Sequence, residues 1–208
     1  AALAGQGPNG QLDYGLGFTC DGRLWASSDT TGRFWELDPR NGSVREVNNT
    51  GVPISDIAAR GSELYGIGVK NGFGDPYHQA LYRIDPDTAT ATRVGSLRVS
   101  DALSASGADF DADGVLWATL DSQPPDTDRP TRLAQIDLVT GRATIMGPIT
   151  GIADNISARA LAIGPPGDCL ATGGGSAAME PTLVPGPGLP ALALLVILAV
   201  WTGHRRLY

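Results

Sequence analysis

Short stretches in which apolar and polar residues alternate recur along most of the chain, and they predict β-strands. In the run Leu-Tyr-Arg-Ile at 81–84, successive side chains point to opposite faces of such a strand. Asp-Gly pairs at 21–22 and 113–114 separate neighbouring runs, and glycine supplies there the positive φ angle that a tight hairpin turn needs. The pattern therefore predicts an all-β body of short strands joined by tight turns.

The predicted strands repeat as a unit of about 50 residues. Each unit opens with an apolar strand and a turn, continues with a Leu-aromatic-small motif, and later passes through an Asp-initiated turn into a Thr- or Val-rich strand. The Asp that begins this later turn occurs at Asp38, Asp85 and Asp137. Four short strands in about 50 residues is the size of one propeller blade. We therefore expect a β-propeller-like fold over residues 16–172, with one four-stranded blade per unit.

A fourth copy of the unit begins near residue 160 and contains only the first two strands. Aligned on the third copy, its Cys169 corresponds to Leu116. The second half of the copy is replaced by the Gly/Ser/Pro-rich stretch 173–183, which we interpret as a linker. The chain therefore holds about three and a half blades.

The half blade leaves an open sheet edge, which must be paired or covered. Residues 1–15 supply at most one further strand, and they are interpreted either as the remnant of a signal peptide or as a truncated blade. We therefore expect these blades to be part of a larger ring with further blades upstream. A compact four-bladed ring is the alternative.

The blade repeats resemble those of bacterial exported β-propeller proteins. The resemblance is carried by the run DGRLWA at 21–26 and by the runs LYRIDP at 81–86 and LAQIDLVTG at 133–141. It covers roughly residues 15–172 and implies the architecture. It says little about chemistry, because propellers serve hydrolases, lyases, lectins and scaffolds alike.

Composition and charge narrow the classes of function. The 28 glycines and 15 prolines among 208 residues suit short strands and turns better than long helices. The net charge of −7 argues against a nucleic-acid-binding surface, which requires clustered Lys and Arg. Two His and two Cys leave little material for a zinc cluster or a disulfide framework.

The C-terminal segment 184–208 differs in composition from the body. It contains a Pro/Gly-rich motif, an uncharged apolar run at 189–201, and a basic pair, Arg205 and Arg206. The run is shorter than the about 20 apolar residues of an ordinary transmembrane helix. Its place after a linker and before two arginines nevertheless favours a transmembrane helix over a helix buried in the body. The positive-inside rule then places the arginines in the cytoplasm and the β-body outside.

This tail resembles the PEP-CTERM class of bacterial C-terminal sorting signals and its IPTL-CTERM variant. The motif is formed by Val184, Pro185, Gly186, Pro187 and Gly188, and it is similar to the Val-Pro-Glu-Pro core of that class, with Gly186 in the place of the acidic residue. The resemblance implies sorting to the cell surface, with an exosortase-type membrane protease as the processing partner. An anchor that stays uncleaved is the alternative.

Asp109, Asp111 and Asp113 have the D-x-D-x-D-G spacing of a calcium-binding loop, in which alternate carboxylates converge on one ion. The aligned positions of the first copy, within 17–21, hold Gly and Thr in place of the first two Asp. A hairpin turn without an ion therefore explains the same pattern. Calcium is the one cofactor that the sequence suggests.

Cys20 and Cys169 both lie outside the membrane on this interpretation, in a compartment where disulfide bonds form. A bond between them would tie the first blade to the last and stabilise the fold by about 2–4 kcal/mol. Two separate thiols are the alternative.

Together these features predict an exported β-propeller protein of the cell surface or envelope, with a binding or structural role and a single C-terminal membrane segment. An extracellular polysaccharide or a protein is the expected partner, and nucleic acid is not. The competing prediction is a metal-assisted hydrolase or lactonase-like propeller enzyme. Such an enzyme needs carboxylates that point into the central channel from successive blades. Asp38, Asp85 and Asp137 recur instead at a turn, where local hydrogen bonds explain them.

Overall fold

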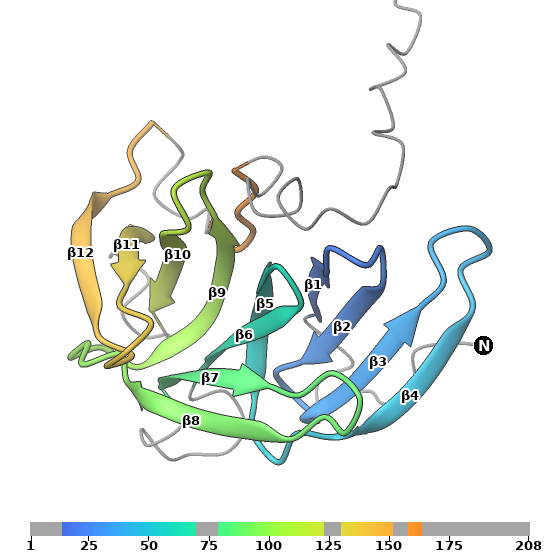
Figure 1. Ribbon diagram of the computed structural model, residues 1–208. Helices are drawn as coiled ribbons and strands as arrows, with labels where there is room; N and C mark the ends of the chain where they lie inside the picture. The colour runs from blue at the N-terminus through green and yellow to red at the C-terminus, as the bar shows by residue number, and fades with distance from the viewer. Residues whose placement is uncertain (1–13, 70–78, 123–129, 152–157, 164–208) are drawn as a thin grey trace, which may run out of the picture. The chain divides into compact units, whose positions relative to one another are not determined.

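The computed structural model describes residues 14–69, 79–122, 130–151 and 158–163 (Figure 1). Within these residues the chain forms twelve strands in three sheets of four antiparallel strands, and the strands of each sheet follow one another in chain order. The predictions of an all-β body and of a four-stranded repeating unit are therefore confirmed.

The three sheets correspond to the three complete copies of the repeat. The first sheet contains β1 (Tyr14–Phe18), β2 (Leu24–Ser28), β3 (Arg33–Leu37) and β4 (Val44–Asn49). The second sheet contains β5 (Ile54–Arg60), β6 (Glu63–Gly68), β7 (Ala80–Ile84) and β8 (Ala91–Ser96). The third sheet contains β9 (Leu103–Phe110), β10 (Leu116–Ser122), β11 (Arg132–Ile136) and β12 (Ala143–Pro148).

The turn between the first two strands holds an aromatic side chain in place. In the first sheet the indole Nε1–H of Trp25 donates a hydrogen bond to Thr19 Oγ1 at 3.0 Å. In the third sheet the indole Nε1–H of Trp117 donates to Asp111 Oδ2 at 2.7 Å. Thr19 and Asp111 therefore have the same structural role, although one is a hydroxyl and the other a carboxylate.

The Asp-initiated turn between the third and fourth strands has one hydrogen-bond pattern in all three sheets. The acidic residues are Asp38, Asp85 and Asp137. Each carboxylate accepts the backbone N–H of the residue two positions further along, at 2.9–3.0 Å. The fourth residue after each Asp has a positive φ angle of 59–73°. It is glycine in the first and third sheets, as this conformation favours, and Ala89 in the second.

The first strand of each sheet packs against the first strand of the next. β5 contacts both β1 and β9, and all residues of β5 except Arg60 are buried. The fourth strands, β4, β8 and β12, are mostly exposed or half-buried. In the second and third sheets the first strand is therefore more buried than the fourth, as expected for blades whose first strands lie innermost, whereas Leu16 and Phe18 on β1 of the first sheet are exposed.

The hydrophobic core lies at the joins between neighbouring sheets. At the first join, Trp25 and Phe34 of the first sheet belong to one buried cluster with Ile57 of the second. At the second join, the rings of Tyr65 and Phe110 form a T-shaped pair with 5.7 Å between their centroids. A large apolar side chain buried in this way contributes about 2–3 kcal/mol, so each sheet is stabilised by its neighbour.

The predicted linker 173–183 and sorting segment 184–208 lie outside the described residues, as does the second strand of the fourth copy. Part of the predicted first strand of that copy lies within the described residues 158–163, which form no strand; there the N–H of Ile163 donates to Asp109 Oδ2 at 2.7 Å. Among the residues that the structure describes, no helix is long and apolar enough to cross a membrane. The C-terminal transmembrane helix stays a prediction.

Candidate functional site

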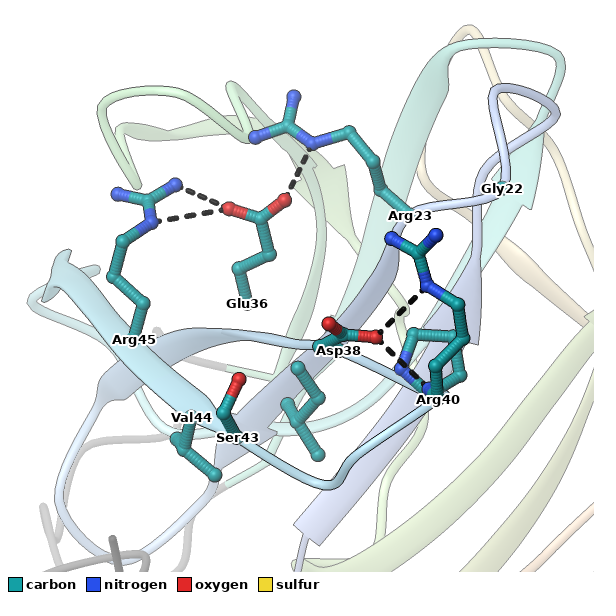
Figure 2. A pocket seen from close by; sticks show the side chains of 10 residues that line it. Gly22, Arg23, Glu36, Asp38, Arg40, Ser43, Val44 and Arg45 are labelled. Carbon is teal, nitrogen blue, oxygen red and sulfur yellow. Dashed lines mark hydrogen bonds and ion pairs between the residues drawn. The ribbon is translucent and has the colours of Figure 1, made fainter.

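A polar pocket of about 350 Å³ lies on the first sheet, between its first turn and its Asp-initiated turn (Figure 2). Three arginines and two carboxylates line it, together with smaller turn residues. The lining residues are Gly22, Arg23, Glu36, Leu37, Asp38, Pro39, Arg40, Ser43, Val44 and Arg45.

Glu36 on β3 is held between two arginines. The Nε–H of Arg23 donates to Glu36 Oε1 at 2.8 Å, and Arg45 donates to Oε2 from both Nε, at 3.1 Å, and Nη2 (Figure 2). The hydrogen bond from Arg23, followed by that from Arg45, lowers the pKa of Glu36 to about 2. Glu36 is therefore ionised at any physiological pH.

Arg23 is fixed on three sides. Besides Glu36, its Nη1 donates to Asp87 of the second sheet at 3.1 Å, and its guanidinium carbon lies 4.1 Å from the centre of the Trp25 ring. The hydrogen bond with Glu36 is the main cause of a raised Arg23 pKa. Arg23 therefore both lines the pocket and joins two sheets.

Arg40 and Arg45 present their guanidinium groups to solvent. Their side chains are 90% and 60% exposed, respectively. The N–H of Arg40 also donates to Asp38 Oδ1 at 2.9 Å, and this bond is the main cause of a lowered Asp38 pKa. Three arginines and two carboxylates therefore line the pocket, with Asp87 of the second sheet paired to Arg23 beside it, and the exposed, planar guanidinium groups of Arg40 and Arg45 suit the oxygens of a carboxylate, sulfate or phosphate.

A pocket at this place occurs on the second sheet as well, but it is lined by different charges. A pocket of about 590 Å³ occupies the same place on the second sheet. Strand pairing identifies the positions that correspond to Arg23, Glu36 and Arg45. In the second sheet they hold Glu63, Arg83 and Thr92. In the third sheet they hold Val115, Gln135 and Thr144. The excess of arginine therefore belongs to the first sheet.

The residues of the predicted calcium loop make other hydrogen bonds. Oδ1 of Asp111 accepts the N–H groups of Asp113 and Val115 at 3.0 and 2.9 Å, and these bonds close the turn. The two oxygens of Asp109 accept the N–H groups of Phe110 and Ile163 at 2.8 and 2.7 Å. Within the described ranges, no three His, Cys, Asp or Glu side chains are arranged to hold a metal ion. Calcium binding stays a prediction.

A buried carboxylate that the sequence analysis did not single out joins the three sheets. Asp56 on β5 is 9% exposed, and its Oδ2 accepts the N–H of Ala108 on β9 at 2.6 Å. It also accepts N–H groups from Ile57 and from Leu16 on β1. Burial, reinforced by the nearby charge of Asp109, raises the pKa of Asp56 to about 7.

The sequence shows that Asp56 is unusual, but it does not show which groups Asp56 binds. One acidic residue interrupts the otherwise apolar strand at 54–59, whereas the positions paired alike in the other sheets hold Gly15 and Gly107. A Cβ atom at Gly15 would overlap the Cα atom of Asp56. Glycine on one strand therefore makes room for the carboxylate of the next.

The remaining predicted site residues lie partly outside the described residues. The N–H of Cys20 donates to the carbonyl oxygen of Gly61 at 3.0 Å and so links the first turns of two sheets. Its expected partner Cys169 lies outside the described residues, so the disulfide stays a prediction. The same holds for the sorting motif at 184–188 and for Arg205 and Arg206.

Comparison with known proteins concerns the fold. No protein-family model and no curated protein matches the chain. Similar solved structures include virginiamycin B lyase from Staphylococcus aureus (18% identity, TM-score 0.44, covering 69% of this chain and 43% of that one). Others are a chain of the nidogen/laminin complex (13%, 0.47, 65% and 48%) and PQQ-bound aldose sugar dehydrogenase from Streptomyces coelicolor (15%, 0.42, 65% and 47%).

The chain spans less than half the length of each of these structures. Their TM-scores below 0.5 carry no argument about activity. The β-propeller-like assignment rests on the three four-stranded sheets and on the contacts between their first strands.

Proposed function

We propose that this is an exported β-propeller-like protein of the cell envelope, sorted or anchored through residues 184–208, whose β-body has a binding or structural role. The export part is supported by the order of motif, apolar run and arginine pair at the end of the sequence. The binding part is supported by the arginine-rich pocket of the first sheet.

The pocket suits a polymer that carries carboxylate groups, such as an acidic extracellular polysaccharide. The observation that carries this proposal is the pairing of both pocket carboxylates with arginines, while Arg40 and Arg45 remain largely exposed to solvent. Arginine forks bind carboxylates through two parallel hydrogen bonds, which gives specificity as well as attraction. The net charge of −7 opposes long-range attraction, so we expect short-range, salt-sensitive binding.

Binding is tested by titrating the full chain with polygalacturonate, and with dextran as the neutral control. We expect binding to polygalacturonate alone, weakened at high salt, and a loss of at least about tenfold for Arg40→Ala/Arg45→Ala, corresponding to about 1.4 kcal/mol. The matched variant Arg83→Ala alters the second-sheet pocket and should leave binding unchanged. Equal binding to dextran, or an equal loss for Arg83→Ala, would contradict the assignment.

Export is tested separately, by fractionating the host cells and determining the C-terminus of the protein by mass spectrometry. A processed end near Pro185 supports sorting by an exosortase-type protease, and an intact tail in the membrane fraction supports a plain anchor. Full-length protein in the cytosol would remove both.

The competing hydrolase requires carboxylates that are free to activate water or hold a metal. Among the described residues, Asp56 and Asp109 lie on neighbouring first strands, but both accept backbone N–H groups. No observation on the described residues favours the hydrolase over the binding role.

A further inference from the structure

The first strands β1, β5 and β9 each have a neighbouring strand on one side only, so their other edge is free within the sheet. At such an edge the backbone N–H groups of alternate residues have no partner in the sheet. Buried N–H groups nevertheless require acceptors. The acceptors found at these free edges therefore show what the edges bind.

The free edge of β9 carries three N–H donors, two residues apart, and each of them binds a side-chain oxygen of β5 or β9. They are Ser106, which donates to Ser55 Oγ at 2.9 Å, Ala108, which donates to Asp56 Oδ2 at 2.6 Å, and Phe110, which donates to Asp109 Oδ1 at 2.8 Å. Two of the three acceptors are carboxylates. The free edge of β9 is therefore a row of donors that binds mainly carboxylate oxygens.

The carboxylate of Asp56 accepts the same N–H group from all three sheets. Leu16, Ile57 and Ala108 are equivalent residues of β1, β5 and β9, as their pairing with the second strands shows. The N–H groups of all three donate to Asp56. Because the donors are equivalent backbone groups, the repeat itself brings them together, whichever side chain stands at position 56.

A buried hydroxyl group lies beside the same carboxylate. A Cβ atom added at Gly15 would lie 2.8 Å from Asp56 Oδ1 and 2.9 Å from Ser27 Oγ, so the two oxygens lie on either side of one point. Ser27 is fully buried, and its hydroxyl group has no hydrogen-bond partner among the residues that the structure describes. It is therefore a further donor for a carboxylate at this place.

A second carboxylate binds equivalent N–H groups one register position further on. The oxygens of Asp109 accept the N–H groups of Phe110 and Ile163 at 2.8 and 2.7 Å. In the alignment that matches Cys169 with Leu116, Ile163 corresponds to Phe110. Carboxylate binding by equivalent N–H groups of neighbouring repeats is therefore seen twice.

We propose that the N–H groups of Leu16, Ile57 and Ala108 form a carboxylate-binding site of the repeat, in which the side chain of Asp56 is a built-in ligand. In the wild type Asp56 fills the site. When that side chain is removed, a small free carboxylate such as formate binds in its place and is held by the three N–H groups and by the hydroxyl of Ser27. The donors are neutral and buried, so the site differs in kind from the arginine-rich pocket and does not depend on the ligand proposed for it.

The site is tested with Asp56→Gly in the full chain, with sodium formate as the probe and sodium chloride at equal ionic strength as the control. Formate bound to the folded state alone should raise the thermal midpoint of Asp56→Gly by about 2–4 °C. The wild type, whose site is filled, should not respond. Leu103→Ala is the matched control, because it removes a fully buried side chain of β9 without removing an N–H acceptor, and formate should leave its midpoint unchanged.

Amide hydrogen exchange shows where formate binds. We expect the amides of Leu16 and Ala108 to exchange at least about tenfold faster in Asp56→Gly than in the wild type, relative to other amides of the same strands, and to slow again in formate. A raised midpoint without slower exchange at these two amides would place formate elsewhere and overturn the proposal. Equal stabilisation by chloride, or of Leu103→Ala by formate, would overturn it as well.

If Asp56→Gly does not fold, Asp56→Asn provides the test. The asparagine side chain fills the space but replaces one acceptor oxygen by an NH₂ group, which accepts no hydrogen bond. We then expect faster exchange at Leu16 or Ala108, with no effect of formate because the site stays filled. Exchange at both amides as slow as in the wild type would overturn the proposal.

Discussion

The first and second sheets share a frame but differ in charge. In both, strand pairing shifts by one residue at the same point of the third strand, after Phe34 in one and after Leu81 in the other. Both close with the same Asp-initiated turn. Yet an Arg–Glu–Arg set lines the first pocket, where the second carries Glu63 and Arg83. Turns and core determine the frame, so differences in function are to be sought in the pocket charges.

The largest effect should come from breaking the join at which the two sheets meet. Trp25→Ala removes a fully buried aromatic residue between them and should lower the free energy of unfolding by about 3–5 kcal/mol. Thr19→Ala removes only the hydrogen-bond acceptor of the indole and should cost about 1 kcal/mol. Urea denaturation of both variants measures the difference. Equal losses would mean that the hydrogen bond, and not the packing, holds the join.

The second-largest effect is a difference in pH dependence: the stability contributed by Asp56 of the second sheet changes over another pH range than that contributed by Glu36 of the first. The pKa of Asp56 is raised to about 7 in the folded protein, against about 3.9 in an unfolded chain. The unfolded state therefore loses its proton first, and stability is lost as pH rises from about 4 to about 7, by up to about 4 kcal/mol. The pKa of Glu36 is lowered from 4.5 to about 2, so the contribution of its pairing is present above about pH 4.5 and is lost as pH falls from there to about 2.

Urea unfolding between pH 4.5 and pH 8 tests this difference. Asp56→Asn cannot ionise, so its stability should change less over the interval than that of the wild type. Glu36→Gln, in the first-sheet pocket, should keep the slope of the wild type. A slope that persists in Asp56→Asn would assign it to another group.

Exchanging charges between Arg23 and Glu36 tests whether the stability of the first sheet depends on which charges line its pocket. Arg23→Glu or Glu36→Arg alone leaves like charges facing each other and should cost about 1 kcal/mol. The triple variant Arg23→Glu/Glu36→Arg/Arg45→Thr copies the second-sheet arrangement, in which Thr92 stands where the first sheet has Arg45, and should recover part of that loss, since Asp87 still faces position 23. Its binding to polygalacturonate should nevertheless remain reduced. A double-mutant cycle without coupling would show that these charges act independently.

The smallest effect concerns the turn in which the two sheets differ by one methyl group. Ala89 has a positive φ angle of 59° and is fully buried, whereas Gly42 has the same conformation and a Cβ atom added there would meet nothing within 4 Å. Ala89→Gly relieves backbone strain but loses buried area, so stability should change by less than about 1 kcal/mol. Gly42→Ala gains no contact and should destabilise by about 1 kcal/mol. Thermal unfolding of the two variants measures whether Gly42→Ala destabilises the protein more than Ala89→Gly does.

The sequence supported prediction of strands, turns and repeat length because these depend on neighbours along the chain. The Asp-Gly pair at 113–114 and the Asp at 137 act within a few residues, and the structure has them at the expected turns. The competing explanation of the motif at 109–113 could also be stated in advance, because the aligned residues of the first copy lack the acidic pattern.

The candidate pocket and the buried carboxylate could not be predicted in the same way. Glu36 meets Arg45 only through strand pairing and Arg23 only across β2 and β3, whose register was not assigned beforehand. Asp56 acquires its partners from β1 and β9, more than 35 residues away on either side. A lone acidic residue in an apolar strand indicates a special position, but only the packing of three strands shows which groups it binds.

The bonds made by Asp56 have a consequence for how such a chain can change through duplication. A unit whose joins were all alike could be copied, deleted or moved without redesigning its neighbours. Here the middle unit offers a carboxylate to both flanking strands, and those strands offer glycines where it offers the acid. Exchanging the first and second units would leave the buried N–H of Ala108 without its acceptor, so one side chain determines which unit stands in the middle.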